Sequence, residues 1–202
     1  MKIICIEGNY KSSSKIPTSL PGFPVFFMKP ESSVLRNKMP FFIPEHTQKI
    51  IPKVNIVLKI CKLGKNIQEK FAHNYYQDIG IGLDMEAADT IKTCKENGLP
   101  WEPAKAYDSS APVGNFVSKK KFETLNNIPF SLLRNNKIII HANTSEMIYS
   151  FDKIIENISK YITLKTGDYI FTGSPEINES ININNKIECF IQENKLLSFN
   201  IK

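Results

Sequence analysis

The chain lacks the long apolar segment that a membrane-spanning helix needs. No apolar run in its 202 residues approaches the roughly 20 residues that cross a bilayer. The first ten residues, MKIICIEGNY, also lack the long apolar core of a signal peptide. We therefore expect a cytoplasmic protein without a membrane partner.

Cysteine and histidine are scarce, and neither shows the spacing of a metal or redox site. The four cysteines are scattered, which predicts reduced structural thiols. The three histidines form no ligand pattern and are expected at the surface or at an interface. The positions are Cys5, Cys61, Cys94, Cys189, His46, His73 and His141.

Charge of one sign is also not concentrated anywhere, although the formal net charge is +6. The lysines are spread along the chain, and the only tight run is Lys119 to Lys121. No aromatic and basic signature of an RNA-binding module accompanies that run, which is typical of a solvated loop. The composition therefore disfavours a nucleic-acid partner.

What is present is an ordinary globular balance. Hydrophobic residues make up 42% and charged residues 23% of the chain, enough for one domain over residues 1–202. We expect residues 1–24 to form a short strand and a lid-like loop. Further strands are predicted over 25–30 (buried) and 80–89, and hairpins over 129–140, with Asn135 and Asn136 at the turn, and over 186–202.

Three helices complete the expected pattern. One is predicted over 66–79, with Asn66 as its N-cap and Gly80 as its stop, and a second ends at Gly98. The third lies within 145–164, with apolar residues including Tyr161 facing inward. Many short strands and few helices predict an α+β fold dominated by β-structure.

The segment 50–61, IIPKVNIVLKIC, reads as a strand with an unusual polar pair. Because strand side chains alternate, Lys53 and Asn55 share one face, while Val54, Ile56 and Leu58 share the other. The local pattern allows two readings. The polar face either meets water, as in a half-solvated strand, or lines a site.

Several segments, in this order, resemble the fumarylacetoacetate hydrolase family, in its short branch of acylpyruvate hydrolases and oxaloacetate decarboxylases. The most specific are GLPWEPAKAYDSSAPVG and TLKTGDYIFTGSP, supported by IICIEGNY, VFFMKP, GLDMEAAD and NTSEMIYS. The resemblance covers nearly the whole chain. It implies a rolled β-structure with flanking helices, like the family's C-terminal domain, and usually a homodimer.

The resemblance also implies a metal site that this chain has altered. In the family, Mg²⁺ or Mn²⁺ sits on a Glu-x-Glu pair and an Asp and stabilises the enolate of a small 2-oxo acid. The Asp corresponds to Asp84, but the two Glu positions hold Lys53 and Asn55. A lysine about 5 Å from a divalent ion would repel it by roughly 6–7 kcal/mol at an effective dielectric near 20. We expect no metal bound in the family mode, and one simple arrangement pairs Lys53 with Asp84.

Other family positions also differ. The resemblance implies a His and Glu base dyad after the NY motif, where Ser13 and Ile16 stand, and neither is a general base at neutral pH. The family's Arg is Ala88, a nearby Gln is Lys92, and a further amide is replaced by Ile140.

Some site positions are retained. The resemblance implies a catalytic role for Lys105, which would steady developing negative charge. It implies substrate binding by Thr144, which would contact a carboxylate, and by Thr172, Gly173 and Lys29 around the pocket; Lys92 would add a cation. Simpler readings stay open: Asp84 could cap the following helix, Lys105 could be a surface lysine, and both threonines could be turn hydroxyls.

Two functional hypotheses follow. The first is a pseudoenzyme, or small-anion binder, descended from C–C bond hydrolases or decarboxylases of small 2-oxo acids. The second is an active, metal-independent enzyme in which Lys53 or Lys105 forms an imine with a 2-oxo acid.

Overall fold

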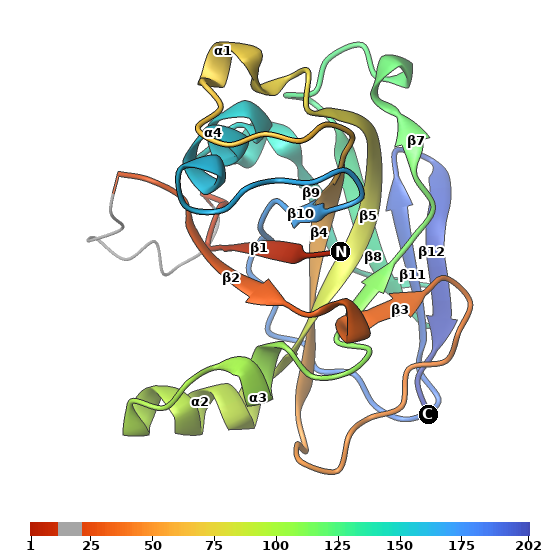
Figure 1. Cartoon of the computed structure of the whole chain (residues 1–202). Coiled ribbons are helices and arrows are strands. Elements are labelled where there is room, and N and C mark those ends of the chain that lie inside the picture. The colour runs from red at the N-terminus through yellow and green to blue at the C-terminus, as the bar shows by residue number, and fades with distance from the viewer. Residues whose placement is uncertain (12–21) are drawn as a thin grey trace.

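A computed structural model describes residues 1–11 and 22–202, and its strands form two sheets (Figure 1). The larger runs in the order β2-β1-β10-β4-β5-β6-β3, with β7 paired to β5, and the smaller in the order β12-β11-β8-β9. The β-dominated α+β class is confirmed. The strands are β1 (Ile3–Glu7), β2 (Val25–Lys29), β3 (Val34–Arg36), β4 (Ile50–Ile60), β5 (Tyr76–Ala87), β6 (Ala111–Val113), β7 (Val117–Ser118), β8 (Pro129–Arg134), β9 (Lys137–Asn143), β10 (Tyr169–Phe171), β11 (Lys186–Ile191) and β12 (Asn194–Asn200).

In the described part of the chain, two helices of about three turns and two single helical turns accompany the sheets. Helices α1 and α4 lie together at one end of the molecule, whereas α2 and α3 lie together at the other (Figure 1). None of the helices among the described residues is long and apolar enough to cross a membrane. The helices are α1 (Glu69–Ala72), α2 (Ala88–Asn97), α3 (Glu102–Lys105) and α4 (Phe151–Tyr161), and the 3₁₀ turns are η1 (Glu31–Ser33), η2 (Lys119–Lys121) and η3 (Thr144–Glu146).

The long antiparallel pair β4 and β5 is the centre of the larger sheet. Its register places Lys53 opposite Asp84 and Asn55 opposite Gly82. Strand β4 is buried on both faces over much of its length, since Asn55 is 2% exposed on one face and Ile56 and Leu58 are inaccessible on the other. The half-solvated reading of this strand is therefore wrong, because side chains on both of its alternating faces are buried.

Helix α4 and the hairpins follow their local sequence signals. The Ser150 hydroxyl caps α4 by accepting a hydrogen bond from the Lys153 N–H, and Ile154 and Ile158 are buried. Tyr161 was predicted to face inward but is exposed at the helix end. The turn between β8 and β9 holds Asn135 and Asn136 at positive φ, as a two-residue hairpin loop requires.

The predicted helix over 66–79 is wrong for most of its length. Only the single turn α1 forms, and β5 already begins at Tyr76. Asn66 has φ of +51° and cannot be the predicted cap, while Gly80 lies inside the strand, where a Cβ would approach the Phe116 ring to 2.9 Å. Pairing with β4 is a long-range interaction, and it overrides the local helical spacing.

Strand β2 differs from the buried strand that was predicted. It lies at the edge of the larger sheet, paired only with β1, and Val25 and Met28 are exposed. Only Lys29 at its end is buried. Most of the predicted lid-like loop, including Ser13 and Ile16, lies outside the described residues.

Candidate active-site cavity

A cavity of about 260 Å³ opens beside the central strands of the larger sheet. Strand β1 contributes Glu7, β4 contributes Lys53 and Asn55, and β5 contributes Asp84 and Glu86. Strand alternation places the two acids of β5 on one face, as it does the polar pair of β4. The remaining lining residues are Cys5, Ile6, Gly8, Ile51, Lys95, Ser174, Pro175, Glu176, Ile177 and Asn178.

Lys105 is the hub of an ion-pair cluster behind this cavity. It ends the single turn α3 and is 2% exposed. Its Nζ lies 2.5 Å from Glu86 Oε2, 2.9 Å from Asp84 Oδ2 and 3.3 Å from Glu7 Oε2. Burial by itself lowers the pKa of Lys105, but attraction to Asp84, Glu7 and Glu86 raises it well above its usual value. Lys105 is therefore a buried cation at neutral pH, which rules out the surface-lysine reading.

Asp84 lies between two lysines. Lys29 Nζ is 2.9 Å from Asp84 Oδ1, on the opposite carboxylate oxygen from Lys105. Burial by itself raises the pKa of Asp84, but Lys105 and then Lys29 hold it well below its usual range. The reading of Asp84 as a helix cap is wrong, since Asp84 lies inside β5 and Ala87 is the N-cap of α2.

Lys29 is more enclosed than the resemblance implied. The residue is 1% exposed, and its ammonium also donates to the Lys105 carbonyl and, at 3.0 Å, to the Ser110 carbonyl. It is not among the described residues that line the cavity, so it acts on Asp84 from behind the cavity wall.

Lys53 forms its ion pairs with acids other than Asp84. Its Nζ lies 2.8 Å from Glu86 Oε2 and 3.4 Å from Glu7 Oε1. Among the described residues, the carboxylate of Asp84 pairs with Lys29 and Lys105 instead, although Lys53 faces Asp84 across the strand pair. Three lysines thus neutralise three carboxylates in one connected cluster, which we call the ion-pair cluster (Glu7, Lys29, Lys53, Asp84, Glu86 and Lys105).

Asn55 links β4 to the segment after β10, which forms part of the cavity wall. Its Oδ1 accepts a hydrogen bond from the Gly173 N–H at 2.8 Å, and its Nδ2 donates to the Lys53 carbonyl at 2.9 Å. Gly173 has φ of +100°, and a Cβ there would lie 2.5 Å from Asn9 Cβ. Only glycine therefore fits, and it directs Ser174 and Pro175 to the cavity.

Thr172 holds the same segment to β4. It is fully buried, and both its hydroxyl and its N–H donate to the Ile56 carbonyl at 3.0 Å. Gly173 therefore lies next to the cavity, whereas the Thr172 hydroxyl is hydrogen-bonded to the Ile56 carbonyl.

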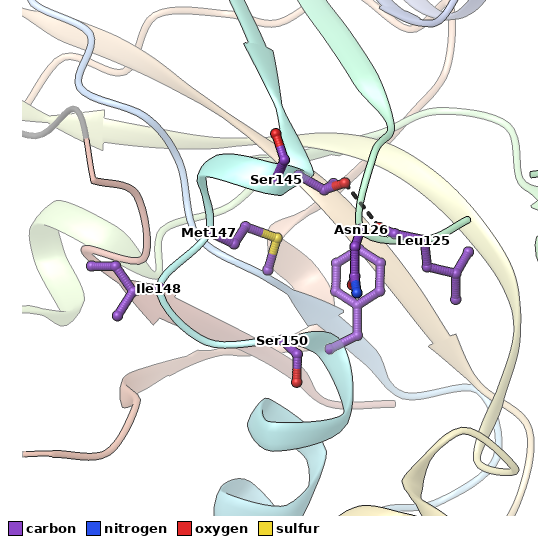
Figure 2. Close-up of a pocket in the computed structure, with 8 residues that line it drawn as sticks. Leu125, Asn126, Ser145, Met147, Ile148 and Ser150 are labelled. Atoms are coloured by element: carbon purple, nitrogen blue, oxygen red, sulfur yellow. Dashed lines mark hydrogen bonds between the residues drawn. The ribbon is translucent and has the colours of Figure 1, made fainter. Parts of the chain in front are cut away.

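Thr144 lies at a different pocket, beside η3 and the start of α4. Its hydroxyl donates to the Leu125 carbonyl and accepts from the Ile128 N–H, each at 2.9 Å. This second pocket has a volume of about 380 Å³ and shares no described lining residue with the first. Figure 2 shows Leu125, Asn126, Ser145, Met147, Ile148 and Ser150 around it.

The cation that α2 supplies to the cavity is Lys95, and the sequence did not indicate it. Lys92, which the resemblance favoured, has a side chain 75% exposed and faces Glu96 at 3.8 Å. Lys95, one turn later, lines the cavity. The resemblance pointed to the right helix but to the wrong turn for contact with the cavity.

Glu7 and Glu86 are the other residues that sequence reasoning missed. A signal was present for Glu86, since it lies two residues after Asp84 and therefore on the same strand face. Nothing local marks Glu7, whose partners Lys53 and Lys105 are distant in the chain.

The donor atoms present do not fit a divalent metal in the family's mode. A metal would need free carboxylate oxygens at positions 53, 55 and 84. Lys53 supplies a cation, Asn55 Oδ1 is engaged by Gly173, and both oxygens of Asp84 face ammonium groups. Within residues 1–11 and 22–202, no three Asp, Glu, His or Cys side chains are grouped to hold a metal ion.

Comparison with known proteins identifies the class to which this fold and cavity belong. The model of the fumarylacetoacetate (FAA) hydrolase C-terminal family matches residues 2–202. The chain belongs to that family, as its motifs indicated.

Two relatives and one solved structure are similar to the chain over most of its length. The chain is 33% identical over 201 residues to mouse "Oxaloacetate tautomerase FAHD1, mitochondrial", covering 99% of this chain and 91% of the relative. It is 33% identical over 192 residues to the "Oxaloacetate decarboxylase, mitochondrial" of Dictyostelium discoideum, covering 94% and 88%. A crystal structure of fumarylpyruvate hydrolase from Pseudomonas aeruginosa in complex with Mn²⁺ and pyruvate superposes with a TM-score of 0.92 at 25% identity, covering 100% of this chain and 89% of the other.

Proposed function

We propose that this chain binds a small carboxylate anion of the 2-oxo acid type in the cavity beside β4 and β5, and that it does not catalyse the metal-dependent C–C bond chemistry of its family. In this reading it is a pseudoenzyme that keeps a binding site. The observation that carries the proposal is the ion-pair cluster, in which Lys53 stands at a family ligand position and the surviving Asp84 is neutralised by Lys29 and Lys105.

The ligand class is supported by the size of the cavity and by the relatives. A volume of about 260 Å³ suits a small metabolite rather than a polymer or a lipid chain. Two relatives are named for oxaloacetate, and one structural neighbour holds pyruvate. These are small 2-oxo acids, which carry at least one carboxylate at neutral pH.

The alternative is an active enzyme that uses a lysine instead of a metal. An imine requires a neutral amine, and the three carboxylates around Lys105 raise its pKa and keep it protonated. This leaves Lys53, whose ammonium also contacts two acids. Borohydride trapping with oxaloacetate separates the hypotheses: the pseudoenzyme gives neither adduct nor turnover, with or without Mg²⁺, whereas a reduced adduct at either lysine supports the alternative.

Restoring the two family carboxylates tests the proposal directly. We expect Lys53→Glu combined with Asn55→Glu to bind Mg²⁺ or Mn²⁺ more tightly than the parent, by at least tenfold in calorimetry. Two anionic donors are added next to Asp84 and Glu86, and a repelling cation is removed.

The matched control is Lys53→Gln with Asn55→Gln, which removes the same cation but adds no anionic donor. This control should gain less affinity than the Glu pair. Micromolar Mg²⁺ binding by the parent chain would contradict the proposal, as would metal-stimulated turnover of oxaloacetate.

Two further properties stay predictions of the same proposal. A homodimer is expected by analogy with the family, and light scattering after gel filtration measures it: the chain of 23.0 kDa should elute with twice that mass. A cytoplasmic location also stays a prediction, which fluorescence microscopy of the tagged chain tests.

A further inference from the structure

Among the residues that the structure describes, Lys95 is the lysine of the cavity wall without an acidic partner. The described lining contains two lysines, and Lys53 is engaged by Glu86 and Glu7. Within residues 1–11 and 22–202, Lys95 forms no salt bridge; its recorded contact is with the Trp101 ring, whose centroid lies 4.9 Å from Nζ. The cavity therefore presents one positive charge that no carboxylate in the described part of the chain pairs with directly.

The position of Lys95 is fixed by the helix and by Trp101. Ile91 and Cys94 anchor α2 in the protein, and Gly98 ends it in the left-handed conformation with φ of +62°. This places Lys95 in the last turn, where its exposed side chain extends over the indole ring. A cation held against one aromatic face keeps donors directed away from the ring.

We propose that Lys95, steadied by Trp101, is the residue that recognises the carboxylate of the ligand at this cavity. This inference rests on the proposed function and assigns its anion-recognition residue. The four other basic candidates are unsuitable: Lys29, Lys53 and Lys105 are neutralised inside the ion-pair cluster, and Lys92 does not line the cavity. The ligand class is a short 2-oxo acid whose carboxylate contacts Lys95 while its remainder occupies the cavity.

The experiment is calorimetry with oxalate, an unreactive dicarboxylate probe, on the full chain at low ionic strength. We expect Lys95→Ala to raise the Kd five- to tenfold and Lys95→Arg to stay within about twofold of the parent. Lys92→Ala, on the same helix, compares the lysine favoured by the sequence with the lysine favoured by the structure. Lys120→Ala, an exposed lysine remote in the chain, controls for net charge.

The outcomes separate this inference from the proposed function. If the parent binds oxalate and Lys95→Ala binds it equally well, the assignment of Lys95 is wrong while the binding function stands. A larger loss in Lys92→Ala or Lys120→Ala than in Lys95→Ala also overturns the assignment. If the folded parent binds neither oxalate nor oxaloacetate, the proposed function and the assignment of Lys95 both fail. Near-ultraviolet circular dichroism verifies that each variant is folded.

Discussion

The cavity beside β4 and β5 and the pocket beside η3 differ in the charge of the side chains around them. The cavity beside β4 and β5 is backed by the ion-pair cluster, whereas the pocket beside η3 has no charged side chain in its described lining. In the pocket beside η3, the Thr144 hydroxyl donates a hydrogen bond to the Leu125 carbonyl and accepts one from the Ile128 N–H. Both pockets therefore keep residues of the family motifs, but in each those residues make internal contacts.

The comparison shows that a residue at a motif position can be fully engaged by contacts within the protein. Lys105 ends α3 and Asp84 lies within β5, and each neutralises the other. Thr144 remains in its turn, yet its hydroxyl bonds are complete without a ligand. The charged cavity should dominate the energetics of the variants, because unpaired buried charge costs more than an unpaired buried hydroxyl partner.

The largest effect is expected for Lys105→Met. The substitution keeps an apolar stem but leaves Asp84, Glu86 and Glu7 without their common cation. Breaking a buried pair in this way typically costs about 3–5 kcal/mol of unfolding free energy. Urea denaturation followed by circular dichroism measures the change.

The control for that variant is Lys120→Met, which should change stability by less than about 0.5 kcal/mol, because Lys120 is exposed. If Lys105→Met were as stable as the parent, the ion-pair cluster would not be a stabilising feature of the charged cavity.

The second-largest effect is expected in the pH dependence of the unfolding free energy, to which the ion-pair cluster is the main contributor. The pKa of Asp84 is held well below its usual value of 3.8 by Lys105 and Lys29, so its stabilisation is complete above that value and is lost as pH falls further. A carboxylate held in this way typically contributes about 2–3 kcal/mol. At the alkaline end, the raised pKa of Lys105 means that its contribution is complete below 10.5 and is lost at higher pH.

Urea unfolding at a series of pH values tests this behaviour. Other acids with lowered pKa values, including Glu7, Asp168 and Glu188, add to the acid limb. The informative quantity is therefore the difference between the parent and Asp84→Asn. That variant should be less stable at pH 7 and should lose less stability below pH 4; equal slopes for the two proteins would argue against the assigned pairing.

The smallest effect is expected in the uncharged pocket. Thr144→Val removes the acceptor of the buried Ile128 N–H and the donor to Leu125 while keeping the side-chain shape. An unsatisfied buried group costs about 1–3 kcal/mol. The loss should be the same at pH 4 and pH 7, since no titratable group takes part, and a loss larger than that of Lys105→Met would reverse the ranking of the two pockets.

Local signals predicted the elements that local interactions control. The asparagines of the β8–β9 turn tolerate positive φ, Gly98 ends α2 in the left-handed conformation, and Ile154 and Ile158 follow helical spacing along α4. The helix predicted over 66–79 fails for the opposite reason. Tyr76 and the residues after it pair with β4, and this long-range pairing outweighs the local helical spacing.

The candidate site, too, could be predicted only in part from the sequence. Its location could be predicted because Lys53 and Asn55 share a strand face and lie at recognisable family positions. The partners of Lys53 could not be predicted, since Glu7 comes from β1 and Glu86 from β5. Lys95 was missed because the motif match does not tell which turn of α2 faces the cavity.

The sequence by itself determined the family, the β-dominated class and the presence of Lys53 and Asn55 where the resemblance implies carboxylates, because these depend on which residues occupy which positions. Only the tertiary structure decided how the remaining charges are paired. Coulombic energy depends on distance and burial, and both are set by strands and turns that meet only when the sheet is assembled. For that reason Lys53 pairs with Glu86 and Glu7, Asp84 is held by Lys29 and Lys105, and Lys95 is left as the cation that faces the cavity.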